Sequence, residues 1–303
     1  MNNTEILNTI KNQFPEINAK LNEPLKNHTY IKTGGNADIY ILPTTIEEVQ
    51  TIITYAHESD IPLTILGYGS NVLIRDEGIR GIVLNLGAFN EISLDGTSIK
   101  CGCGASIIDV SRFALQNELT GLEFACGIPG SVGGALVMNA GAYGGEVSYV
   151  LKSATVLTTD GKLMTLTKGE FQFGYRKSVF AKENYIVLEA EFELQIGNVN
   201  EIKEKMDEFT LARETKQPLE YPSCGSVFKR PPNNFAGKLI SDSGLKGKRI
   251  GGVEVSTKHA GFMVNVDNAT TTDYLNLIQF VQDTVKEKFG IELEREVKIL
   301  GGE

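Results

Sequence analysis

The stretch over residues 124–145 holds seven glycines and no charged residue, and it constrains the fold more than any other feature of this chain. Glycine loses more backbone entropy on folding than other residues, so this density indicates positions that need positive φ or close backbone approach. A polyanionic cofactor needs both, because a bare backbone lets N–H groups point at phosphate or ring oxygens. A smaller glycine loop, residues 67–71 (Gly-Tyr-Gly-Ser-Asn), lies upstream. The pair predicts two backbone cradles for one large ligand.

Two simpler explanations compete with a cofactor. A membrane span is disfavoured, because seven glycines, a proline and an asparagine make the stretch too polar. Small residues that let a helix pack tightly against a sheet remain an alternative for residues 133–135. That alternative accounts poorly for Gly127, Gly130 and the Gly144–Gly145 pair, which lie in loop-like sequence.

Composition narrows the class of protein. A chain of 303 residues with 41% hydrophobic residues predicts two or three lobes with real cores. The net charge of −9 argues against general binding to nucleic acid or to anionic membranes. No basic region followed by an apolar run opens the chain, and the four cysteines lack framework or zinc-ligand spacing. We therefore expect a cytoplasmic protein with free cysteines and no metal site.

The first part of the chain reads as β-α-β. Residues 37–42 and 62–66 are predicted strands, and Thr45 with Glu48 forms a capping-box pattern that opens a helix to about residue 57. The second strand delivers the 67–71 loop at its carboxyl end, where α/β sheets often bind ligands. That loop lacks the third glycine of a dinucleotide fingerprint and no long helix follows, so a Rossmann domain is disfavoured.

The remaining elements suggest further lobes. We expect helices over residues 107–119, 199–216 and 273–289, a hairpin over 154–166 that turns at Asp160-Gly161, and strands over 185–194, 252–255, 261–266 and 291–300. Residues 217–218 (Gln-Pro) mark a boundary. The predicted domains are residues 1–87, 88–197 and 198–303.

A basic island lies in the last part. Residues 226–258 hold five lysines and two arginines against two acidic residues, a local net charge of +5. In an acidic chain this excess indicates an anionic ligand, although lysines scattered over a solvated face explain it as well.

Three polar residues stand in unusual settings. Arg176 is flanked by aromatic residues, Ser226 follows a glycine in a loop, and Glu296 lies in the predicted last strand. Singly, each has an ordinary explanation as an ion-paired arginine, a loop-capping serine or a solvent-facing glutamate. Ser226 lacks a nucleophile-elbow pattern and has no evident histidine base, so a serine hydrolase is disfavoured.

Six motifs together narrow the interpretation. They occur at residues 27–35, 66–71, 127–134, 175–178, 225–229 and 293–297. Their order resembles that of the UDP-N-acetylenolpyruvoylglucosamine reductase family, over residues 27–300. The resemblance implies an α+β fold with a two-lobed FAD-binding part of the vanillyl-alcohol-oxidase type. A C-terminal α+β substrate-binding domain follows, whose last strand returns to the active site. Val227 and Arg230 depart from the usual family pattern, and the short chain resembles the subclass without a tyrosine lid loop.

The resemblance implies a flavin reductase of peptidoglycan synthesis. NADPH would reduce non-covalently bound FAD, and enolpyruvyl-UDP-N-acetylglucosamine would then accept the hydride at its vinyl carbon. Arg176 and Glu296 would stabilise charge on the substrate carboxylate, and Ser226 would donate a proton to the α-carbon. A flavin oxidase on the same scaffold and a binding module without turnover are the rival interpretations.

The implied binding residues form two sets. The residues expected to hold FAD are Gly67, Tyr68, Gly69, Ser70, Asn71, Gly127, Ile128, Pro129, Gly130, Ser131, Gly133, Gly134, Asn139, Gly141, Ala142 and Tyr143. The residues expected to bind substrate are Tyr175, Arg213, Lys216 and Lys229. We expect a monomer whose partners are small molecules, with no nucleic acid and no membrane insertion.

Overall fold

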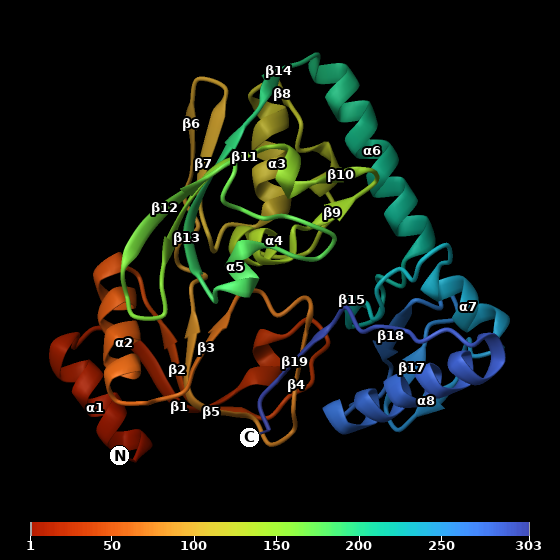
Figure 1. Ribbon diagram of the computed structural model, residues 1–303, viewed down its shortest axis with the longest axis horizontal. Helices are drawn as coiled ribbons and strands as arrows, with labels where there is room; N and C mark the ends of the chain where they lie inside the picture. The colour runs from red at the N-terminus through yellow and green to blue at the C-terminus, as the bar shows by residue number, and fades with distance from the viewer. Residues whose placement is uncertain (1, 303) are drawn as a thin grey trace. The chain divides into compact units, whose positions relative to one another are not determined.

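The computed structural model describes residues 2–302 (Figure 1). The chain forms two compact units, each built from separate stretches of sequence. Unit 1 holds the residues up to Leu21, Ile39–Tyr68 and Gly81–Arg213, and unit 2 holds Asn22–Asp38, Gly69–Arg80 and the residues from Glu214 on. The three continuous domains expected from sequence stay a prediction.

The amino-terminal elements follow the predicted β-α-β pattern. A four-stranded sheet has the order β1-β2-β5-β3, and β3 runs parallel to β5. The capping box at Thr45 and Glu48 is confirmed, because each side chain accepts from the other residue's backbone N–H. The elements are α1 (Asn3–Gln13), β1 (Asn18–Pro24), η1 (Leu25–His28), β2 (Asn36–Leu42), α2 (Ile46–Glu58), β3 (Leu63–Leu66) and β5 (Ile79–Asn85).

A second sheet of unit 1 is antiparallel and has the order β12-β11-β13-β7-β6. The predicted hairpin is confirmed, with Gly161 at φ 82° in its turn. Its strands are β6 (Ile92–Asp95), β7 (Ser98–Gly102), β11 (Leu151–Leu157), β12 (Leu163–Thr167) and β13 (Ile186–Glu193). The helices and short elements around it are α3 (Ile107–Gln116), β8 (Leu119–Thr120), η2 (Glu123–Ala125), α4 (Val132–Met138), β9 (Gly141–Ala142), β10 (Gly145–Glu146), η3 (Val147–Tyr149), α5 (Val179–Lys182) and β14 (Gln195–Ile196).

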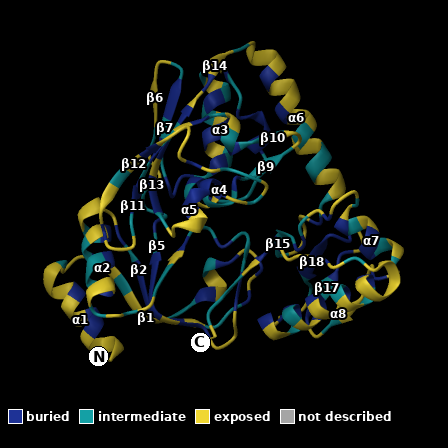
Figure 2. Ribbon diagram, in the orientation of Figure 1, coloured by how far each residue is buried: buried dark blue, intermediate teal, exposed yellow. Residues whose placement is uncertain are grey.

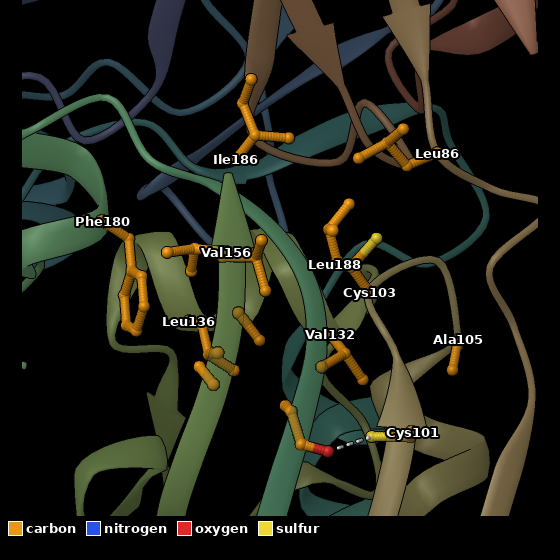
Figure 3. Packing of buried hydrophobic residues seen from close by; sticks show 14 of the residues in the cluster. Leu86, Cys101, Cys103, Ala105, Val132, Leu136, Val156, Phe180, Ile186 and Leu188 are labelled. Carbon is orange, nitrogen blue, oxygen red and sulfur yellow. Dashed lines mark hydrogen bonds between the residues drawn. The ribbon is translucent and has the colours of Figure 1, made fainter. Parts of the chain in front are cut away.

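Part of the core of unit 1 lies between this sheet and α4, and the same core extends to α1, α2 and the first sheet. Figure 3 shows Val132 and Leu136 of α4 among Val156, Leu188 and Cys103, all of them buried. The glycine-rich stretch therefore contributes the apolar side of a seven-residue helix to the core, and the rest of the stretch forms loops and the short β9–β10 hairpin.

Unit 2 has its own sheet and core. The sheet order is β15-β18-β17-β16, and β4 pairs in parallel with β19. Helix α8 follows a Thr270 capping box and ends at Phe289, and Gly290 caps it in a left-handed conformation with φ 68°. The elements are β4 (Val72–Ile74), β15 (Ser223–Ser226), α7 (Ala236–Asp242), β16 (Arg249–Ile250), β17 (Val253–Val255), β18 (Phe262–Asn265), α8 (Thr271–Phe289) and β19 (Lys298–Leu300).

Helix α6 (Val199–Lys216) has the predicted bounds and is largely exposed (Figure 2). Only Ile202 and Met206 of this helix are buried. The polar sequence of α6 is thus explained by a narrow line of contact, through Ile202 and Met206, with Cys126 of the same unit.

Two predicted boundaries are wrong. The helix expected over residues 107–119 ends at Gln116, because Glu118 takes a left-handed backbone conformation with φ 57° and the chain then enters β8. The strand expected over residues 291–300 is reduced to β19. Before β19 the chain changes partner, since Arg295 bridges Phe228 while Lys298 pairs with Val72.

Candidate active site

The two glycine loops meet inside unit 1. A Cβ atom on Gly67 would lie 2.6 Å from Ser131 Oγ. Ser131 is buried and caps α4, because its Oγ accepts from Gly134 N at 3.3 Å. Only a residue without a side chain therefore lets the first loop approach the second. The contact supports the hypothesis that the two loops serve one ligand.

The first loop continues into unit 2 with a second obligatory glycine. Gly69 has φ 66°, and a Cβ there would lie 2.2 Å from His28 O. Its carbonyl accepts from Tyr30 N at 3.1 Å. The loop is thus held by backbone contacts, which leaves a bare chain of the kind that a large polar cofactor needs.

Helix packing explains Gly133. Its N–H donates to Cys103 O at 2.8 Å, and a Cβ would lie 3.1 Å from Cys103 Cβ. The neighbouring Gly134 is exposed, and a Cβ there would meet only Ser131 Oγ, at 3.4 Å. The packing alternative is therefore correct for Gly133, and it gives Gly134 no steric reason to be glycine.

Gly133 and Gly134 are adjacent residues of α4 that allow a matched comparison of alanine substitutions. We expect Gly134→Ala to raise the free energy of unfolding by about 0.5–1 kcal/mol, because alanine loses less backbone entropy in a helix. Gly133→Ala is expected to gain nothing or to destabilise, because its Cβ must displace Cys103. Urea unfolding of both variants measures the difference. Equal stabilisation by the two substitutions would contradict this account.

A tight hairpin explains three other glycines. Tyr143 (φ 52°) and Gly144 (φ 83°) form the two-residue turn between β9 and β10, where positive φ at both positions is typical. A Cβ on Gly145 would lie 2.7 Å from the Phe124 ring, and one on Gly141 would lie 2.7 Å from Gly145 O. Packing of a helix against a sheet therefore does not explain the Gly144–Gly145 pair. A Cβ on Gly144 would have nothing within 4 Å, so turn geometry accounts for Gly144, whereas the close approach of Phe124 accounts for Gly145.

Both ends of the glycine-rich stretch contact α6. The Tyr143 ring stacks on Phe209 with centroids 4.4 Å apart. Arg213 donates a hydrogen bond to Gly127 O, and a Cβ on Gly127 would lie 2.9 Å from Arg213 Cδ. The predicted substrate ligand Arg213 thus lies against the loop expected to hold the flavin.

Arg176 lies in a strained turn. Gly174 and Lys177 exchange backbone hydrogen bonds of 3.0 Å, so Tyr175 and Arg176 occupy the two central positions. Arg176 has φ 55°, a left-handed conformation that costs a residue with a side chain about 1–3 kcal/mol. Its guanidinium carbon lies 5.2 Å from the Tyr175 ring centroid. Such strain persists only where surrounding contacts fix the turn.

Ser226 and Glu296 lie on neighbouring segments of unit 2. Glu296 N donates to Val227 O at 2.8 Å, and Lys229 N donates to Glu294 O at 2.8 Å. Asn71 Nδ2 donates to Glu296 O at 3.3 Å, and Lys298 N donates to Asn71 O at 3.1 Å. Unit 2 therefore brings together two predicted catalytic residues and one predicted flavin ligand that are distant in sequence.

Several cations of the basic island, residues 226–258, pair with acidic or aromatic side chains. Lys229 pairs with Glu294, Lys238 with Asp242 and Arg249 with Asp267. The Arg230 guanidinium carbon lies 4.1 Å from the Phe235 ring centroid. This distribution favours the solvated-face explanation of the island. The predicted substrate ligand Lys216 is exposed at the end of α6.

The sequence did not predict that His259 lies close to the Ser226 segment. Its Nδ1 accepts from Gly261 N at 3.1 Å, and Gly261 O accepts from Val227 N at 3.0 Å, next to Ser226. Burial, with the nearby charge of Lys246, lowers the pKa of His259. No local sequence signal places this histidine, because the pairing of β15 with β18 creates the proximity.

His259 predicts a pH dependence of stability. The pKa of His259 is lower in the folded chain than the value of about 6.5 that is usual for an unfolded chain. The contribution of the neutral imidazole to folding stability is therefore complete above about pH 6.5. It is lost as the pH falls from there toward the pKa of the folded chain. We expect the difference in unfolding free energy between the wild type and His259→Asn to shrink from about pH 7.5 to about pH 5.5. Urea unfolding at both pH values measures it. A constant difference would contradict the prediction.

Comparison with known proteins identifies the family. UDP-N-acetylenolpyruvoylglucosamine reductase 2 of Bacillus cereus is 65% identical over 301 residues, which cover 99% of each chain. The chain belongs to the UDP-N-acetylenolpyruvoylglucosamine reductase family. The family model of this reductase's C-terminal domain matches residues 217–300, and that of the FAD binding domain matches residues 37–167.

Other members of the reductase family agree. The Listeria welshimeri relative is 60% identical over 295 residues, covering 97% of this chain and 99% of its own. The crystal structure of UDP-N-acetylenolpyruvylglucosamine reductase from Thermus caldophilus superposes with a TM-score of 0.81 at 34% identity, covering 94% of this chain and 99% of that one. The predicted fold class is confirmed, and the protein is an FAD-dependent oxidoreductase. Within residues 2–302, no helix is both long and apolar enough to cross a membrane.

The structure is compatible with FAD at the glycine loops. The Gly67–Ser131 approach leaves no room for a side chain where the loops meet, and Gly69 lies on the same bare chain. The residues predicted to hold FAD fall into both units. Gly67, Tyr68 and the predicted ligands between Gly127 and Tyr143 belong to unit 1, and Gly69, Ser70 and Asn71 belong to unit 2.

Proposed function

We propose that this chain uses NADPH to reduce the enolpyruvyl group of enolpyruvyl-UDP-N-acetylglucosamine, giving UDP-N-acetylmuramate for peptidoglycan synthesis. The observation that carries the proposal is the pairing of Glu296 N with Val227 O, because it places Glu296 beside the Ser226 segment. Membership of the reductase family and the FAD-binding match support the same reaction.

Each residue has a separate role in this proposal. Bound FAD would supply hydride chemistry, accepting from NADPH and donating to the vinyl methylene carbon of the substrate. That addition pushes negative charge through the α-carbon into the carboxylate, and Arg176 offers a fixed charge and a planar fork to hold it. Ser226 donates its hydroxyl proton to the α-carbon. Glu296 assists only when it is protonated or when a cation offsets its charge, since a bare carboxylate repels the developing charge.

The ligand-binding roles form the second part of the proposal. Residues 67–71 hold the flavin pyrophosphate, and residues 127–143 hold the isoalloxazine and ribityl chain. Tyr175, Arg213, Lys216 and Lys229 contact the substrate. A flavin-bound structure in which either loop lies beyond hydrogen-bond distance from the cofactor would contradict this division. We also propose that the protein acts as a monomer in the cytoplasm.

One anaerobic experiment tests the reaction against its rivals. The purified protein should be yellow, lose its colour with NADPH and recover it when enolpyruvyl-UDP-N-acetylglucosamine is added. A flavin oxidase would recover its colour only with oxygen. A binding module would not be bleached at all. Absorbance of the flavin through the additions separates the three outcomes.

A further inference from the structure

We propose that Asn139 is a positioning residue for Arg176, acting through the carbonyl of Gly174. This inference rests on the proposed role of Arg176 in substrate reduction. It also gives Asn139 a different task from the flavin contact expected from sequence.

The side chain of Asn139 is buried and hydrogen-bonded to other residues of the protein. Asn139 is 1% exposed, and its Nδ2 donates to Gly174 O at 3.2 Å and to Glu146 Oε1 at 3.1 Å. Its Oδ1 accepts from Ser148 N at 3.0 Å. Both amide hydrogens and the amide oxygen are therefore used by neighbouring segments.

Gly174, whose carbonyl accepts this hydrogen bond, is the first residue of the strained turn that contains Arg176. Gly174 O also accepts from Lys177 N at 3.0 Å, so one carbonyl closes the turn and receives Asn139. On the far side of the turn, Ser178 Oγ donates to Val137 O at 2.8 Å. The end of α4 thus holds the turn at both of its ends, and these contacts oppose relaxation of the left-handed Arg176.

An asparagine is suited to this position for two reasons. Residue 139 has φ 43°, and asparagine adopts a left-handed conformation more readily than most residues. An amide also donates and accepts at once, whereas an aspartate at the same position only accepts. Replacement by aspartate therefore removes the bond to Gly174 while keeping the size of the side chain.

The double variant Asn139→Asp with Glu146→Gln isolates that bond. Reversing the polarity of the pair lets residue 146 donate to residue 139, so their contact is restored while residue 139 no longer donates to Gly174 O, which keeps only its bond from Lys177 N. Glu146→Gln alone is the matched control, because it leaves the Asn139–Gly174 bond in place. We expect the double variant to slow flavin reoxidation by substrate by about 10–100-fold. The control should reoxidise at the rate of the wild type.

A double-mutant cycle with Arg176→Ala decides whether the effect passes through Arg176. If it does, the double variant causes no further loss in the Arg176→Ala background. An equal loss in both backgrounds, or none in either, overturns the inference while leaving the proposed function standing. If Arg176→Ala itself reoxidises normally, the proposed role of Arg176 fails and the inference fails with it.

Amide exchange gives a readout that is independent of catalysis. We expect the Lys177 amide, which donates to Gly174 O, to exchange at least about 10-fold faster in the double variant, with β13 amides unchanged. Asn139→Ser is a second variant with a shorter side chain, and the same result is expected. Unchanged exchange at Lys177 in either variant would overturn the inference.

Discussion

Ser226→Ala is expected to leave bleaching of the flavin by NADPH intact and to slow its reoxidation by substrate by about 10²–10⁴-fold. The proposed hydroxyl proton is needed only when the α-carbon of the substrate is protonated, and general acids contribute about this factor. Stopped-flow absorbance of the two half-reactions, measured separately without oxygen, gives both rates.

Ser223→Ala is the matched control, since Ser223 lies in the same strand and pairs with Val264. Its two rates should equal those of the wild type. Equal damage to both half-reactions in Ser226→Ala would remove Ser226 from the proton-donor role. An unimpaired second half-reaction would do the same.

Arg176→Ala is expected to lower substrate-driven reoxidation by about 10²–10³-fold, again with NADPH reduction preserved. The guanidinium is proposed to stabilise charge that develops on the substrate carboxylate, and loss of one such donor costs about this factor. Arg176→Lys should recover only part of the rate, because an ammonium lacks the planar fork. Single-turnover reoxidation over a range of substrate concentrations separates binding from the chemical step.

Lys177→Ala provides the control for Arg176, because it removes the adjacent cation and keeps the backbone hydrogen bonds of the turn. Its rates should stay near those of the wild type. If Arg176→Ala weakens only substrate binding and leaves the limiting rate unchanged, Arg176 binds the ground state and does not stabilise the transition state.

Local signals in the sequence were sufficient for many elements. The capping box at Thr45 and Glu48 and the terminating Gly290 both act within a few residues, so short-range chemistry fixes them. The hairpin at Gly161 is equally local, since its turn requires positive φ. The ordered motifs also located Ser226 and Glu296 as candidates before any contact between their segments was known.

Contacts between distant segments could not be predicted in this way. The role of Gly145 depends on the Phe124 ring, and that of Gly133 depends on Cys103. The shortened last strand follows from a change of partner between Phe228 and Val72. The sequence around Asn139 indicates a flavin ligand, whereas its hydrogen bond to Gly174 O appears only once the chain is folded.

The parallel pairing of β4 with β19 has a consequence for synthesis on the ribosome. Val72 meets Lys298, so β4 emerges more than two hundred residues before the strand that pairs with it. Vectorial synthesis therefore exposes the edge of an apolar strand, with Leu73 destined for full burial, for most of translation. Unit 2 cannot complete this strand pair until β19 has been synthesised. Between the synthesis of β4 and that of β19, a chaperone or a neighbouring chain has access to β4.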